Sequence, residues 1–166
     1  MPGIAAIAPT SSGDEIGMIF LIERQPELQP TYVASRIGIM TLYNKPFVDH
    51  GVYALLSHAR HSINFFVQAI THKKLLMLFP DTKTIVEYQV VEQAEYKARS
   101  GSSPISELKK LEEGSTWEKS TAVYNRYYTG AYPLVLQTCI EKFGNVNYGR
   151  LFLLCQEAKN GTYTWD

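Results

Sequence analysis

Four histidines, all those in the 166-residue chain, fall between positions 49 and 73, where imidazoles could bind a metal or act as bases. On a helix, His50, His61 and His72 would stack in one line about 16 Å apart, too far to share a metal. His58 and His61, at i and i+3, could supply two ligands, but no Cys, Asp or Glu follows at i+4 or i+7. The spacing therefore predicts no metal site.

Phe65 would fall on the same side of that helix as the histidines. A solvated polar face is one interpretation, but a phenylalanine beside imidazoles is better explained by a covering surface. We expect the face with His58, His61 and Phe65 to lie against a second subunit or the N-terminal arm. Association or stability should then weaken as the histidines become charged, between about pH 7 and pH 5.5.

The tyrosine-rich stretch 117–132 is a second candidate surface. Tyr124, Arg126, Tyr127 and Tyr128 would lie on one helix, and aromatic rings beside a cation can stack on a ring-bearing ligand or on bases. The same rings can instead fill a core that keeps its hydroxyls at the rim. Nearby charges of opposite sign oppose a groove that follows a phosphate backbone, so nucleic acid is an unlikely partner. Core and partner surface both stay open.

A catalytic interpretation needs a nucleophile or a base, and a pocket that holds it. Cys139 and Cys155 lie in apolar runs, where a free thiol is usually a small buried hydrophobe rather than a nucleophile or half of a disulfide. Ser57 precedes His58, but neighbouring helical positions do not aim a nucleophile at a base. The spacing of the remaining candidate acids and bases selects no reaction. These are Glu23, Asp49, His50, Asp81, Glu87 and Glu141.

The longest amphipathic pattern runs from Asp49 to Lys73 and predicts one helix with Asp49 as its N-cap. Its core face should consist of Val52, Leu55, Leu56, Ala59, Ile63, Phe66, Val67 and Ile70. Capping residues and glycines predict further helices at 104–113, at about 116–129 and at 134–143.

Apolar runs predict strands at 16–24, 32–43, 75–79, 84–91 and 150–156. The first two should pair as a hairpin, and so should the next two. Asn160-Gly161 predicts a turn that pairs 150–156 with 162–165. Residues 92–99 could extend a strand or begin a helix. This order, without regular βαβ spacing, predicts an α+β fold: a single domain over 15–166, with an antiparallel sheet built from hairpins and helices packed on one face, preceded by a flexible arm over 1–14.

Sixteen Lys and Arg balance sixteen Asp and Glu, so no net charge attracts nucleic acid or an anionic membrane, and neutrality favours self-association. No signal peptide or membrane span is predicted, so we expect a soluble cytoplasmic protein. The function predicted first is a non-catalytic binding or assembly module that acts through protein–protein association, as a homo-oligomer or with a partner, and without a cofactor. The alternative is a small-ligand-binding or hydrolytic enzyme with a pocket between sheet and helices.

Overall fold

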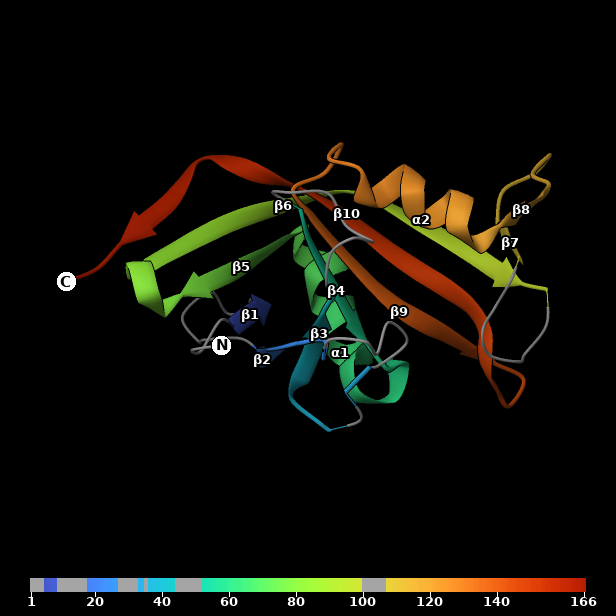
Figure 1. The fold of residues 1–166 in the computed structure, drawn as a ribbon, viewed down its shortest axis with the longest axis horizontal. Helices are drawn as coiled ribbons and strands as arrows, with labels where there is room; N and C mark the ends of the chain where they lie inside the picture. Colours follow the sequence, from blue (N-terminus) through green and yellow to red (C-terminus); the bar gives the residue numbers. More distant parts are fainter. Residues whose placement is uncertain (1–4, 9–17, 27–32, 35, 44–51, 100–106) are drawn as a thin grey trace.

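Strands dominate the computed structural model, which describes residues 5–8, 18–26, 33, 34, 36–43, 52–99 and 107–166 (Figure 1). In chain order the strands are β1 Ala5–Ala8, β2 Met18–Arg24, β3 Ile39–Leu42, β4 Tyr53–Ser57, β5 Lys74–Phe79, β6 Thr84–Ala98, β7 Glu107–Lys110, β8 Trp117–Lys119, β9 Leu134–Lys142 and β10 Asn145–Thr164. The helices are α1 Ala59–His72, α2 Ser120–Tyr128 and a short 3₁₀ turn at Pro80–Thr82. No helix in these residues has the length and apolar content needed to cross a membrane.

Eight of the strands close into a barrel. Neighbours follow the order β10-β9-β4-β3-β2-β1-β5-β6, and β6 also pairs with β10, which joins the two ends. β7 and β8 extend the sheet outward from β6, at the end of the molecule opposite the C-terminus (Figure 1). The prediction of an α+β fold, with an antiparallel sheet of hairpins and helices packed on one face, is therefore wrong.

Two parallel strand pairs explain why the hairpin pattern failed. β2 runs parallel to β3, so the two segments expected to form the first hairpin do not form one, and β4 runs parallel to β9. Parallel neighbours need long connections, and local turn signals carry no information about them. At the second pair, the Thr138 hydroxyl donates a 2.7 Å hydrogen bond to the carbonyl of Ser57, 81 positions away.

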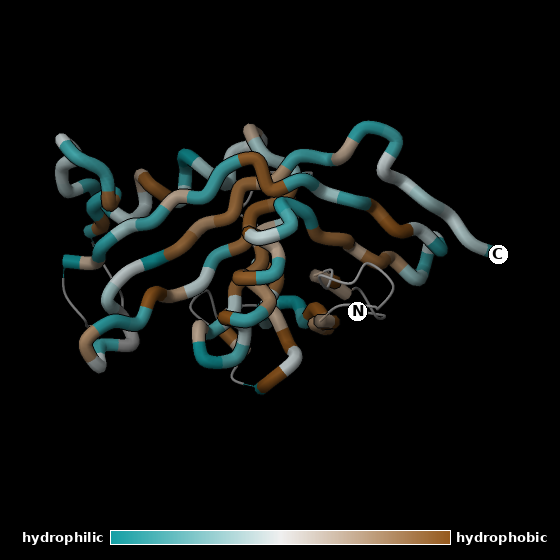
Figure 2. Tube along the Cα trace, turned by 180° about the vertical axis from the view of Figure 1, so that it is seen from behind, coloured by the Kyte–Doolittle hydropathy of each residue, from teal (hydrophilic) through white to brown (hydrophobic). Residues whose placement is uncertain are grey.

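Hydrophobic clusters lie on both sides of the barrel wall, because successive strand residues point to opposite faces of a sheet. The barrel core fills the interior with residues from all eight barrel strands and from α1; its large members include Phe20, Met40, Phe65, Phe66, Met77, Tyr88 and Leu136. The outer cluster lies beneath α2 and includes Tyr96, Leu108, Val123, Tyr127, Tyr128 and Phe152. Figure 2 shows the hydrophobic segments gathered in the middle of the molecule, with hydrophilic residues toward the C-terminus.

The segment 49–73 is not one helix. Its first part forms β4, and α1 begins only after His58; residues 49–51, including the expected N-cap, lie outside the described part. α1 contacts β1, β5, β6 and β9, so it lies across one end of the barrel. Phe65 and Phe66 enter the core, whereas Ile63 and Val67 are 47% and 48% exposed. The predicted core face is therefore rotated, and the ring of Phe65 packs 5.3 Å from that of Phe20 inside the barrel.

The remaining elements divide between confirmed and wrong predictions. The strand expected at 16–24 is confirmed over its described part, Met18–Arg24, and strands at 75–79 and 84–91 are confirmed, as is the β5–β6 hairpin; residues 92–98 extend β6. Predicted helices at 104–113 and 134–143 are wrong, because the described residues there form β7 and β9. The helix expected near 116–129 is shorter and begins at Ser120. Asn160, at φ 57°, marks an irregularity inside β10 rather than a hairpin turn. Residues 5–8 of the expected arm form β1, between β2 and β5.

Candidate active site

Strands β9 and β10 and the residue that follows β4 place three polar side chains at adjacent positions of the barrel wall. These are Cys139, Arg150 and His58, and we call them the row. Arg150 of β10 pairs directly with Cys139 of β9. On the other side of β9 the parallel register pairs Ser57 with Thr138. His58 follows in extended conformation, with φ −67° and ψ 138°, and therefore comes beside Cys139. Adjacent strands lie about 4.8 Å apart, so the imidazole, thiol and guanidinium leave the backbone at neighbouring positions.

All three side chains of this row point outward from the barrel. Leu136 and Leu151 belong to the barrel core, and Cys139 and Arg150 lie an odd number of positions from them in their strands, so they face the other way. The same alternation in β4 carries His58 to the outer side. Cys139 is half-buried, which leaves its thiol within reach of a ligand.

The surroundings of His58 favour its neutral form, although the side chain still reaches solvent. Burial contributes most to lowering the pKa of His58, and the nearby His61 and Arg150 lower it further, while a hydrogen bond to the backbone of Val33 opposes them. The His58 and His61 rings meet edge to face, with 5.8 Å between centroids. A neutral imidazole keeps one nitrogen free to accept a proton, so His58 can serve as a base for the neighbouring thiol.

Two tyrosine hydroxyls adjoin the Cys139–Arg150 pair. Tyr124 of α2 hydrogen-bonds Arg150, and burial raises the pKa of Tyr124 although the Arg150 charge opposes that shift. Burial also raises the pKa of Tyr43, whose hydroxyl interacts with both Arg150 and Cys139. Both phenols are therefore protonated at neutral pH and can donate hydrogen bonds.

Tyr128 fixes these rings to β9. Its hydroxyl accepts a 2.7 Å hydrogen bond from Nε2 of Gln137, two positions before Cys139. Its ring stacks on Tyr124 with centroids 5.9 Å apart and meets Tyr43 edge-on at 5.7 Å. We call Tyr43, Tyr124 and Tyr128 the tyrosine wall. It holds α2 over β9 and β10, so the row lies beside a rigid aromatic surface.

The seven residues predicted to bind a partner do not form one surface. His58 and Tyr124 lie at the row, and His61 and Tyr128 are their immediate neighbours. Phe65 is fully buried in the barrel core and offers no surface to a partner.

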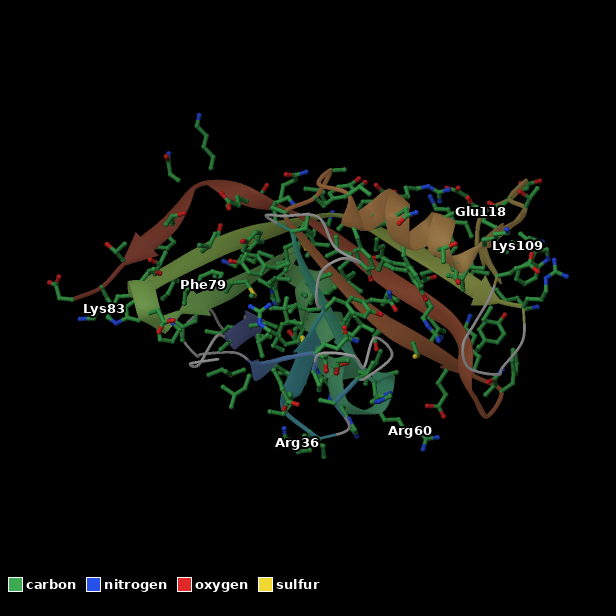
Figure 3. All side chains as sticks on the ribbon, viewed as in Figure 1. Arg36, Arg60, Phe79, Lys83, Lys109 and Glu118 are labelled. Atoms are coloured by element: carbon green, nitrogen blue, oxygen red, sulfur yellow. The ribbon has the colours of Figure 1, made fainter. Side chains whose placement is uncertain are left out.

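Arg126 and Tyr127 belong to a separate group on α2. The Tyr127 hydroxyl lies 2.6 Å from that of Tyr96, and the Arg126 guanidinium donates to Tyr96 at 3.2 Å. Arg126 also pairs with Glu118, which is labelled in Figure 3 near β8. Val123, Tyr127 and Tyr128 of this helix thus belong to the outer cluster, whereas Arg126 is exposed.

Sequence reasoning missed Cys139 and Arg150. Apolar neighbours made Cys139 resemble a structural thiol, but in a strand the residues on either side point to the opposite face. The signal was available as alternation: Val135, Gln137 and Cys139 take one face, and Leu134 and Leu136 take the other. The helix expected over 134–143 concealed that alternation.

The arrangement places a thiol, an imidazole and a guanidinium at neighbouring backbone positions. A thiol beside an imidazole can lose its proton and attack a carbonyl carbon. A guanidinium beside the thiol can then stabilise the negative charge that develops on the carbonyl oxygen. These are the requirements of acyl transfer through a thioester.

Comparison with known proteins bears on the fold. A scan against protein-family models finds no match for the sequence, and a search of curated proteins finds none. The fold is similar to that of sortase A from Listeria monocytogenes, with a TM-score of 0.51 and 15% sequence identity, over 99% of this chain and 90% of that one. At this identity the likeness supports the barrel fold and, independently of the strand pairings, contradicts the predicted α+β class.

Proposed function

We propose that the chain is a cysteine acyltransferase in which Cys139 is the nucleophile, His58 carries the proton and Arg150 contacts the carbonyl oxygen. One observation supports this proposal above the others: the three groups stand in one row across β4, β9 and β10, on the outer face of the wall. A similar fold does not imply a similar activity, so the proposal depends on the row.

The reaction follows from the roles of the three groups. His58 accepts the proton of the Cys139 thiol as sulfur attacks the carbonyl carbon of a peptide or ester. Arg150 stabilises the tetrahedral oxyanion. When the carbon–nitrogen or carbon–oxygen bond breaks, the leaving group takes the proton from His58, and a thioester remains. A second nucleophile gives its proton to His58 and attacks the thioester; the carbon–sulfur bond breaks, and His58 returns the proton to the Cys139 sulfur.

The tyrosine wall favours an amine over water as the second nucleophile. Its rings pack against one another beside the row, where an apolar surface would limit the access of bulk water to the thioester. The protonated Tyr43 and Tyr124 hydroxyls can hold a polar acceptor close to Arg150. We therefore assign transfer to an amine as the main reaction and hydrolysis as the slower one.

Acylation by p-nitrophenyl acetate tests the proposal, because this ester needs no specific recognition. We expect one acetyl group on Cys139 by peptide mass spectrometry, and faster turnover when a primary amine such as cysteamine is added. Cys139→Ala should abolish the adduct, and His58→Gln should slow its formation by about 100-fold or more. Cys155→Ala is the matched control and should leave acylation unchanged. Acylation that is indifferent to His58 and Cys139 would overturn the proposal.

Association through the α1 face remains a prediction from the sequence. Because Phe65 is buried inside the barrel, a Phe65→Asp variant would unfold the chain rather than report on an interface. Light scattering of the wild-type chain over a range of concentrations tests association directly. A monomer at all concentrations would contradict the homo-oligomer.

A further inference from the structure

We infer that the ion pair between Arg60 and Glu141 is a positioning device that sets the His58 imidazole against the Cys139 thiol. This inference depends on the proposed function. Arg60 lies two residues after His58, and Glu141 lies two residues after Cys139. The Arg60 guanidinium donates two hydrogen bonds to the Glu141 carboxylate, from Nε to Oε2 at 3.1 Å and from Nη2 to Oε1 at 2.9 Å.

The Arg60–Glu141 pair is the second of two contacts that join the His58 segment to β9, one before the row and one after it. Ser57 and Thr138 are joined by the 2.7 Å hydrogen bond between β4 and β9, one position before His58 and Cys139. Arg60 and Glu141 are joined two positions after them. Each link spans 81 positions of sequence, the same separation as His58 and Cys139. The row is therefore held between two matched contacts.

The first turn of α1 needs such a contact. His58 is the N-cap of α1, and its side chain makes no capping hydrogen bond. Its carbonyl instead receives the Ser62 hydroxyl at 3.0 Å and the His61 amide at 3.0 Å. Both of these bonds lie within the first turn of α1, whereas the Arg60–Glu141 pair connects that turn to β9.

Stability is a poor explanation of the pair. The Arg60 and Glu141 side chains are 69% and 31% exposed, and exposed ion pairs contribute little to the free energy of unfolding. Figure 3 shows Arg60 at the outer surface. A planar guanidinium fork does, however, fix direction as well as distance when both ends bind one carboxylate. Hydrogen bonding to Arg60 lowers the pKa of Glu141, so the carboxylate stays charged at neutral pH.

The test measures how strongly His58 activates Cys139. The readout is the rate of Cys139 alkylation by iodoacetamide at pH 7 divided by the rate at pH 10, where an ordinary thiol is ionised without a base. His58→Gln should lower this ratio. Arg60→Gln and Glu141→Gln should each lower it by about tenfold, since small misplacement of a reacting group costs up to about 100-fold. Arg60→Glu combined with Glu141→Arg should restore most of it.

Controls separate positioning from folding and from the proposed function. Arg36 pairs with Glu23 at another part of the surface, so Arg36→Gln removes a comparable exposed ion pair and should leave the ratio unchanged. Melting temperatures should stay within a few degrees for all these variants. If His58→Gln lowers the ratio and Arg60→Gln does not, or if the charge exchange fails to restore it, the positioning role is overturned and the acyltransferase stands. If His58→Gln itself has no effect, the proposed function fails.

Discussion

The two cysteines lie in adjacent strands but on opposite sides of the same barrel wall. Cys155 of β10 is fully buried in the barrel core beside Leu134, and burial raises its pKa to about 12. Cys139 of β9 is half-buried on the outer face, opposite Arg150. Both have apolar neighbours in sequence. The comparison shows that the face of a strand, rather than the hydropathy around a cysteine, decides whether its thiol can react.

The sharpest test of this comparison is the difference in thiol reactivity. In the native protein at pH 8, iodoacetamide should label Cys139 at least about 100 times faster than Cys155, because a thiol with a pKa near 12 is almost entirely protonated and the barrel excludes the reagent. Peptide mass spectrometry after timed quenching measures both rates. In guanidinium chloride the two rates should converge. Equal labelling in the native state would place Cys155 outside the core.

The same alternation explains which elements could be predicted from the sequence. The strands around Phe20 and Met77 were predictable because apolar residues run continuously between clear turn signals, and the strand around Val86 was predictable because its two faces differ in polarity. β9 was not, because Pro133 before it and Gly144 after it are also typical helix boundaries. The segment forms a strand because it pairs with β4 along one edge and with β10 along the other. Tertiary contacts therefore overrode the local signals.

The candidate site was only partly accessible to sequence reasoning. His58 and Tyr124 were chosen as contact residues from their helical spacing, yet His58 precedes α1 and takes part in the row through the register of β4. Cys139 and Arg150 needed the β9–β10 pairing, which no local pattern specifies. A barrel closed by β6 and β10 brings together groups that the chain order keeps far apart, so the site follows from topology.

Leu136 and Gln137, neighbours in β9, allow the contributions of the inner and outer faces to the free energy of unfolding to be compared. Leu136→Ala should lower the free energy of unfolding by about 2–5 kcal/mol, because it leaves a cavity in the barrel core. Gln137→Ala should cost about 1–3 kcal/mol, because the buried Tyr128 hydroxyl loses its 2.7 Å partner. Urea unfolding measures both. If Gln137→Ala costs as much as Leu136→Ala, the outer cluster is as tightly packed as the interior.

The outer cluster should also show coupling through hydroxyl groups. Tyr96 and Tyr127 share a buried hydrogen bond of 2.6 Å between their hydroxyls. Tyr96→Phe and Tyr127→Phe should each lower stability by about 1 kcal/mol, and the double variant should cost less than the sum. The remaining contact of Tyr96 with Arg126, at 3.2 Å, makes Tyr96→Phe the more costly of the two. Additive costs would mean that the two hydroxyls act independently.

The smallest expected effect is the acid dependence that His58 adds to stability. Burial, His61 and Arg150 lower the folded-state pKa of His58 below its value of about 6.5 in the unfolded chain. The unfolded state therefore binds this proton more readily, and the contribution is fully present above pH 6.5 and is lost as pH falls through the folded-state pKa. His58→Gln should reduce the fall in melting temperature between pH 7.5 and pH 5. Identical profiles for wild type and His58→Gln would show that Arg150 and His61 leave the imidazole unperturbed, and the neutral base assigned to the outer face would lose its electrostatic basis.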